Sequence, residues 1–189
     1  MRTFIAIKID ISPDFRAFID ALHIRLRENR IKWIDPGNFH LTLFFLGETQ
    51  ESQVRSISND LEKISRNAKQ LELKLRGVGV FKNIRDPRVI WIGIDSNSIL
   101  TELQVEIQKC AESHGFQKDT RPYKPHLTIG RPKKILQKIQ LVEVTNEYQN
   151  TFFGKVIIED IIFYQSLLRR EGPEYRVIKK FPLVPAIPG

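Results

Sequence analysis

The chain has 189 residues, of which 41% are hydrophobic and 28% are charged, a balance typical of a one-domain globular protein that excludes fibrous and disordered chains. No apolar run reaches the ~18 residues of a membrane span, and the single cysteine, Cys110, excludes an internal disulfide and a zinc cluster built from several thiolates. We therefore expect a cytoplasmic protein. Lys and Arg (30 residues) outnumber Asp and Glu (22 residues), and the net charge of +8 favours a polyanionic partner such as nucleic acid.

The first half of the sequence predicts three strands and two helices. Residues 2–9 alternate apolar and polar side chains, which indicates a strand with one buried face. Ser12 and Pro13 are typical of a helix start, and apolar residues then recur at helical spacing. The predicted elements are strands 2–9, 32–34 and 40–46 and helices 12–26 and 52–64.

The second half predicts five strands and two helices. Gly77 and Gly79 lie within a strand pattern, so they indicate a bulge or the close approach of another group rather than a nucleotide-binding loop. Gly172 and Pro173 predict a turn, and the Pro-rich tail from residue 181 is expected to lie extended on the surface. The predicted elements are strands 71–81, 88–95, 125–130, 155–168 and 175–181 and helices 99–110 and 134–142.

The order of these elements indicates the fold class. Strands are joined both by helices and by tight turns, which predicts an α+β fold of mostly antiparallel sheets with helices packed on one face. No linker rich in Pro, Gly or Ser divides the chain, so residues 1–189 are expected to form one domain.

Two of the four histidines begin nearly the same four-residue sequence. Residues 40–43 read His-Leu-Thr-Leu and residues 126–129 read His-Leu-Thr-Ile, each at the start of a predicted strand. The strands and helices around the two motifs also recur. The repeat therefore predicts two similar lobes, each with one motif.

The strand period of two indicates where the motif side chains point. His40 and Thr42 share one face of their strand, and the aliphatic residues that follow each of them share the other face. We expect the aliphatic residues in the core, and His40 and Thr42 between the lobes. The same holds for His126 and Thr128, so two imidazoles and two hydroxyls are predicted to converge on one cleft.

Two imidazoles across one cleft suit general acid–base catalysis, because near neutral pH one can accept a proton while the other donates one. Cleavage of a phosphodiester needs both acts, and threonine hydroxyls can donate hydrogen bonds to its non-bridging oxygens. The sequence lacks the carboxylate cluster of a two-metal phosphoesterase, so we expect neither a metal ion nor a cofactor. Structural roles suffice for the other two histidines: His23 on a helix surface, and His114 at a helix C-terminus, where a cation is favoured.

The paired His-x-Thr-x motifs resemble those of the 2H phosphoesterases. The chain is similar, over nearly its whole length, to the bacterial and archaeal RNA 2′,3′-cyclic phosphodiesterases, which are also called 2′-5′ RNA ligases. The segments that carry this similarity are residues 2–7, 33–47, 79–81, 87–91, 121–131 and 172–175. Gly130 is one departure, since many relatives carry Ala after the second motif.

The resemblance implies a fold of two pseudo-symmetric lobes of mostly antiparallel sheet, with helices on the outer faces and a central cleft. It also implies a reaction in which water opens a terminal 2′,3′-cyclic phosphate and leaves a 2′-phosphate. By their motif positions, His40 matches the family's proton donor to the leaving 3′ oxygen and His126 matches the base that deprotonates water. Thr42 and Thr128 match its phosphate-contacting positions. The residues alone do not assign acid and base, because the two motifs are nearly alike.

Basic and aromatic residues near the motifs are candidates for substrate binding. Arg131, just past the second motif, is the first candidate for a phosphate contact, and Arg121 is another, since arginine can bind phosphate bidentately. Lys133 is more simply explained as part of a solvated surface. Tyr123 and Phe45 could stack on a terminal base, although such residues more often belong to the core.

The expected partners are RNA ends that carry a 2′,3′-cyclic phosphate, tRNA fragments among them, with no membrane and with a monomer sufficient for activity. Two other functions are compatible with the same residues. One is reversible 2′-5′ joining of RNA halves, which is the same chemistry run backwards. The other is a non-catalytic module that binds RNA ends.

Overall fold

The computed structural model describes residues 1–95, 97–169 and 173–186. These residues form nine strands, four α-helices and one short 3-10 helix. In chain order the elements are β1 (Arg2–Lys8), α1 (Pro13–Arg25), β2 (Arg30–Trp33), η1 (Pro36–Asn38), β3 (His40–Glu48), α2 (Glu51–Asn67), β4 (Leu71–Phe81), β5 (Val89–Ile94), α3 (Ser98–Ser113), β6 (His126–Lys134), α4 (Lys138–Glu147), β7 (Phe152–Ile158), β8 (Asp160–Leu168) and β9 (Pro173–Pro182).

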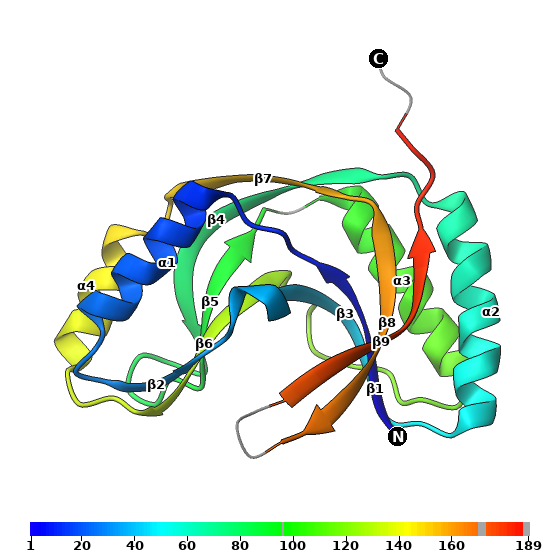
Figure 1. Cartoon of the computed structure of the whole chain (residues 1–189), viewed down its shortest axis with the longest axis horizontal. Helices are drawn as coiled ribbons and strands as arrows, with labels where there is room; N and C mark the ends of the chain where they lie inside the picture. The colour runs from blue at the N-terminus through cyan, green and yellow to red at the C-terminus, as the bar shows by residue number, and fades with distance from the viewer. Residues whose placement is uncertain (96, 170–172, 187–189) are drawn as a thin grey trace.

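The strands form two antiparallel sheets (Figure 1). One sheet has four strands in the order β3-β1-β8-β9, and the other has five in the order β2-β6-β5-β4-β7. The first motif begins β3 and the second begins β6, so each sheet carries one motif. The predicted α+β fold with antiparallel sheets is confirmed.

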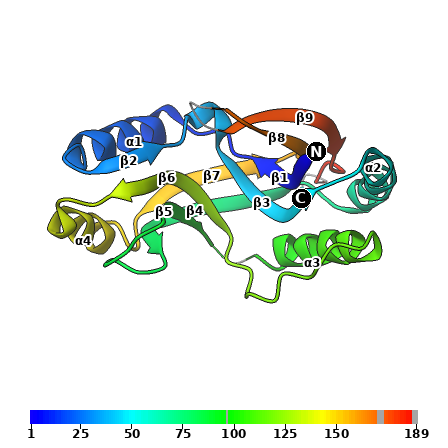
Figure 2. The ribbon, with the colours of Figure 1, turned by 90° about the horizontal axis from the view of Figure 1, so that it is seen from below.

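The helices cover the sheets in two pairs, at opposite ends of the molecule (Figures 1 and 2). Helices α1 and α4 lie beside the five-stranded sheet: the ring of Phe18 packs 4.4 Å from that of Phe153 on β7, and Arg25 donates a 2.6 Å hydrogen bond to Glu147 of α4. Helices α2 and α3 contact each other and the four-stranded sheet. Helix α1 follows β1 in the chain but packs on the other sheet. The first connection of the chain therefore already links the two sheets.

Strand β1 differs from the prediction of one buried face, because it is buried on both. Residues 4–7 are all 2% exposed or less. Strand β1 lies between β3 and β8, with Ile5 and Ile7 in the main core and Phe4 and Ala6 in a second apolar cluster formed with β8. The alternation of apolar and polar residues predicted that one face of β1 meets solvent. In the structure, aromatic side chains cover that face instead.

The prediction of one strand over 155–168 is wrong. Strand β7 ends at Ile158 and pairs with β4, whereas β8 begins at Asp160 and pairs with β1 and β9, so the segment crosses from one sheet to the other. The crossing occupies only Glu159, and no Gly or Pro marks it. Apolar residues occur both before and after Glu159, because β7 and β8 each pack against their own partners. The sequence pattern therefore showed no boundary between the two strands.

Two boundaries near the second motif and the C-terminus also differ from expectation. Strand β6 pairs with β2 as far as Lys134, so α4 starts only at Lys138 and the helix predicted over 134–142 was placed too early. Of the predicted turn, Pro173 begins β9, whereas Gly172 lies outside the described residues, as do residues 187–189 of the tail.

The two glycines of β4 behave as the sequence predicts. Gly77 has φ +75° and lies at a register shift in the ladder with β5, which is a bulge. Gly79 lies beneath the indole of Trp91 on β5, where a Cβ would overlap ring carbons Cζ2 and Cη2. A glycine is therefore required at position 79 so that the indole can lie flat against the sheet.

We predict that Gly79→Ala destabilises the protein by about 1–3 kcal/mol, because the added methyl group forces Trp91 out of its packed position. Urea unfolding measures the change. In a Trp91→Leu background, where the ring is absent, the same substitution should cost much less. An equal cost in both backgrounds would contradict the proposed overlap.

Candidate active site

The two motifs meet at one cavity, although their strands belong to different sheets. His40 and Thr42 of β3 and His126 and Thr128 of β6 all line a cavity of ≈ 350 Å³. The aliphatic residues that follow each of them in the motifs are 2% exposed or less. The predicted division of each motif strand into a core face and a cavity face is therefore confirmed.

Both imidazoles are oriented by the same hydrogen bond. His40 Nδ1 lies 2.7 Å from the carbonyl oxygen of Asn38, and His126 Nδ1 lies 2.7 Å from that of Lys124. A carbonyl oxygen can only accept, so in each ring Nδ1 carries the proton and donates it. Nε2 is therefore left to exchange a proton with a molecule in the cavity.

The surroundings of the two rings differ. His40 lies among aromatic side chains, with the ring centroids of Phe4 and Tyr175 5.2 Å and 5.1 Å from its own. Among the described residues, His126 meets one ring, that of Phe81, edge-on with the ring centroids 4.6 Å apart. The aromatic contacts restrict both imidazoles and remove water from their sides, most completely around His40.

Burial and positive charge lower the pKa of both histidines. For His40 and for His126, burial is the main cause, since it disfavours the charged ring. The guanidinium of Arg131 also lowers the pKa of each, and His126 contributes to lowering that of His40. One arginine thus acts electrostatically on both rings, as expected when the two motifs face the same space.

The predicted phosphate-binding arginines lie in different places. Arg131 lines the cavity together with both histidines, and Arg2, which sequence reasoning did not single out, lines it too. Arg121 is not among the described lining residues. Its side chain is 85% exposed and forms an ion pair with Asp119 at 2.7 Å. We therefore leave Arg121 out of the proposed site.

Of the two predicted stacking residues, one is available to a ligand and the other is not. Phe45 lines the cavity and is 64% exposed, so its ring is available to a base. The hydroxyl of Tyr123 instead donates a hydrogen bond to the carbonyl oxygen of Thr42 at 3.2 Å, and burial raises its pKa. Tyr123 therefore supports the first motif strand from behind and is not offered to a ligand.

Several lining residues come from segments that the motif search did not examine, including Phe4, Ser166 and Tyr175. They reach the cavity from β1, β8 and β9, which are adjacent strands of the four-stranded sheet. Only the similarity of residues 2–7 and 172–175 to the family marked two of these strands in advance. Their position beside His40 depends on strand pairing, which the sequence alone does not give.

The other two histidines lie outside the cavity. His23, expected at the surface, is half-buried: its ring centroid lies 4.2 Å from that of Trp33, with the ring planes tilted by 32°, and its buried Nε2 has no hydrogen-bond partner among the described residues. His114 caps the C-terminus of α3, as expected. It also bonds to α2, through Ser56 Oγ at 3.3 Å and Asp60 Oδ2 at 2.9 Å.

No carboxylate is found among the described residues that line the cavity. Outside it, side-chain atoms of Asp60, Cys110 and His114 that could bind a metal ion lie within 4.8 Å of one another between α2 and α3. Asp60 and His114 already bond to each other, and burial raises the pKa of the Cys110 thiol to about 11, which disfavours a thiolate ligand. We assign this cluster to packing of the two helices.

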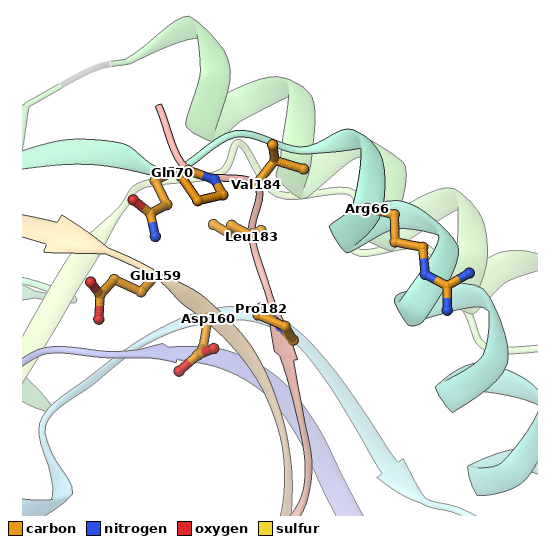
Figure 3. Close-up of a pocket in the computed structure, with 8 residues that line it drawn as sticks. Arg66, Gln70, Glu159, Asp160, Pro182, Leu183 and Val184 are labelled. Atoms are coloured by element: carbon orange, nitrogen blue, oxygen red, sulfur yellow. The ribbon is translucent and has the colours of Figure 1, made fainter. Parts of the chain in front are cut away.

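A second hollow, of ≈ 590 Å³, lies where the chain crosses between the sheets (Figure 3). Glu159 and Asp160 lie on one side of it and Arg66 on the other, and the tail residues Leu183 and Val184 lie between them. Neither motif reaches this hollow, so the site is assigned to the smaller cavity.

The fold and the paired motifs define a phosphoesterase of the two-histidine class, and comparison with known families agrees. The LigT-like phosphoesterase family matches this sequence twice, over residues 9–91 and 92–175, and each match contains one motif. The chain belongs to this family.

Relatives within the family carry a more specific name. A Methanocaldococcus jannaschii protein named RNA 2′,3′-cyclic phosphodiesterase is 36% identical over 181 residues, which cover 96% of this chain and 100% of that protein. A Methanothermobacter thermautotrophicus protein of the same name is 31% identical over 185 residues, covering 97% and 99%.

Solved structures have the same fold. A crystal structure of a Thermus thermophilus protein superposes with a TM-score of 0.80 at 27% identity, covering 97% of this chain and 98% of that one. Escherichia coli LigT complexed with 3′-AMP superposes with a TM-score of 0.73 at 23% identity, covering 96% and 97%. In the described part of this chain, none of the helices combines the length and the apolar composition needed to cross a membrane.

We predict that Arg131→Gln raises the pKa of both His40 and His126, because it removes a cation that disfavours each protonated ring. NMR titration of the ring protons measures the shifts. His23 is the internal control, since its pKa is lowered by burial and by Arg16 and not by Arg131. If only one of the cavity histidines shifted, or if His23 shifted equally, the two rings would not share the electrostatic field of Arg131.

Proposed function

We propose that the protein hydrolyses RNA ends bearing a 2′,3′-cyclic phosphate to 2′-phosphomonoesters, with His40 and His126 as the acid–base pair. The observation that carries the proposal is the matched pair of imidazoles, each held through Nδ1 by a carbonyl oxygen and each lining the same cavity. Membership of a phosphoesterase family and the names of the relatives support the choice of substrate.

The proposed reaction is one in-line displacement at phosphorus. Nε2 of His126 takes a proton from water as the water oxygen bonds to phosphorus. The P–O3′ bond breaks, and Nε2–H of His40 donates its proton to O3′. The products are a 2′-phosphate and a 3′-hydroxyl, and the two histidines return to their starting states by exchanging protons with solvent.

The lowered pKa of His40 suits the donor role. Burial, Arg131 and His126 all disfavour its charged form, so the imidazolium, once formed, is a strong acid. A bound cyclic phosphate brings a negative charge beside the ring and favours protonation. We infer that substrate binding helps to place the proton that the leaving oxygen then receives.

Thr42, Thr128 and Arg131 are proposed to hold the phosphate. The two hydroxyls can donate to the non-bridging oxygens, and the guanidinium can neutralise their charge. We propose that no metal ion takes part, since the neutral His126 activates water, the protonated His40 protonates the leaving oxygen, and the hydroxyls and Arg131 stabilise the charge on the phosphate. The described lining also offers no carboxylate ligand.

Two finer points belong to the same proposal. One chain supplies all the described lining residues, so a monomer suffices. The cytoplasm is the proposed location, where RNA fragments such as those of tRNA would be substrates.

Each of His40→Ala and His126→Ala is expected to lower turnover of a 2′,3′-cyclic-phosphate oligonucleotide by about 10²–10⁴-fold, because each removes one proton-transfer group. The assay contains EDTA, and chromatography identifies the phosphate isomer produced. Thermal melting checks that the fold survives, and His114→Gln is the matched control for losing a histidine outside the cavity. Near-normal turnover by either variant, or a 3′-phosphate product, would refute the mechanism.

The same assay separates the other two functions. If a partner RNA with a 5′-hydroxyl were joined through a 2′-5′ bond, ligation would be part of the activity. If the wild-type protein bound the cyclic end without turnover, it would be a binding module, and the acid–base proposal would be wrong.

The roles of the two histidines can be separated by a leaving group that needs no proton. With a nitrophenyl phosphodiester, His40→Ala should lose much less activity than His126→Ala, because nitrophenolate departs unprotonated while the water still needs a base. The measurement is kcat/KM for the ester and for the cyclic RNA end in both variants. The reverse order would exchange the assignments of acid and base.

A further inference from the structure

Exposed cations continue from the cavity along β6 and β2. Arg131 lines the cavity, and Lys32 of β2 is its register partner in the ladder with β6. Residues directly opposite each other in an antiparallel pair point to the same face. Beyond Arg131 the ladder has a register shift, so Lys133 has no register partner and Arg30 pairs with Lys134. Lys133 is therefore placed next to Arg30, and both side chains are exposed.

The other face of these strands is covered by α1. The ring of Trp33 on β2 packs against that of His23 on this helix. Ile31 and Trp33 lie where a Cβ of Gly130 would point, at 2.9 Å and 3.0 Å, so a glycine fits closely against them. Because Ile31 and Trp33 face the helix, Lys32 between them faces away from it, toward the side of the cavity.

Arg131, Lys133 and Arg30 differ in charge neutralisation from the cations beside β5 and β9. Among the described residues, no carboxylate lies within ion-pair distance of Arg131, Lys133 or Arg30, which begins β2. All three are exposed. They therefore present uncompensated positive charge in one direction, along β6 toward the start of β2.

The cations next to two other lining segments are paired, whereas Arg2, which lines the cavity from β1, forms none of the ion pairs among the described residues. Arg88, which precedes the lining residue Val89, lies 3.3 Å from Asp86. Arg176, which follows the lining residue Tyr175, lies 2.7 Å from Glu174. A polyanion leaving the cavity over these segments would meet carboxylates as well as cations.

An RNA whose cyclic phosphate is at its 3′ end continues from the cavity only on its 5′ side. That part of the chain carries one negative charge per nucleotide, and its affinity for a protein comes largely from lysine and arginine. The direction marked by Arg131, Lys133 and Arg30, three exposed cations outside the ion pairs of the described residues, is therefore the most favourable exit for the rest of the substrate.

We propose that Arg30, Lys32 and Lys133 form a track that binds the phosphates on the 5′ side of the terminal nucleotide, so that the preferred substrate is an oligonucleotide rather than a cyclic mononucleotide. The inference rests on the proposed function. It reassigns Lys133 from a solvated surface to a binding surface for polynucleotide.

The kinetic test compares two substrates that share one reacting group. The ratio of kcat/KM for a five-nucleotide RNA with a 2′,3′-cyclic end to kcat/KM for the cyclic mononucleotide is measured at low salt. We expect a ratio of about ten or more for the wild type, falling at least about fivefold in Arg30→Gln/Lys133→Gln. Lys109→Gln is the matched control, since Lys109 is an exposed cation on α3, at the far end of the molecule from β2 (Figure 1).

A binding test does not depend on turnover. The affinity for a labelled oligonucleotide that ends in a 2′-phosphate is measured by fluorescence anisotropy over a range of salt concentrations. Each lost phosphate contact should reduce the slope of log affinity against log salt by about 0.7, and Lys109→Gln should leave it unchanged. The label is carried at the 5′ end, which lies beyond the proposed track.

The outcomes separate the track from the reaction. A wild-type ratio near one, or a double variant with the ratio and salt slope of Lys109→Gln, would overturn the track and leave the hydrolysis standing. Absence of turnover on both substrates, together with a reduced salt slope in the double variant, would overturn the proposed reaction and support the track.

Discussion

The site depends on one constraint that occurs twice: a backbone carbonyl oxygen, two residues before each motif histidine, accepts the Nδ1 proton of that ring. Without this bond an imidazole could present either nitrogen, and its reactive lone pair would have no fixed direction. The bond requires a sharp change of direction just before the strand. At the first motif, η1 supplies it, with Asp35 capping the turn through the Gly37 amide at 2.7 Å.

The two rings meet only because the chain joins two sheets closely. Strand β8 of the four-stranded sheet follows β7 of the five-stranded sheet after one residue, and β1 is enclosed between β3 and β8. The same arrangement brings Phe4 from the second face of β1 against His40. Burial of β1 on both faces thus contributes to the site as well as to stability, since it removes water from the donor proposed here.

Local patterns predicted most of the elements and the motif faces, because these depend on neighbours within a few residues. The alternation in the two motifs indicated which side chains enter the cavity, and the glycines of β4 indicated a bulge and a close approach. Properties that depend on distant partners were not accessible in this way. Arg121 is paired with Asp119 and Tyr123 supports the backbone of Thr42, although both stand close to the second motif in sequence. Tyr175, 135 residues after His40, meets its ring because β9 pairs with β8.

Two nearly identical motifs come to differ through their surroundings. The family match over each half of the chain indicates that the motifs are equivalent parts of a repeat. Three neighbouring aromatic rings and the charge of His126 act on His40, whereas Phe81 is the ring that meets His126. In the first environment the imidazolium holds its proton weakly and gives it up readily, and a leaving oxygen requires such a donor. A ring in the second, less enclosed environment has access to water, which is what a base that activates water requires. The division of labour that we propose for the two histidines therefore rests on packing, not on the motif itself.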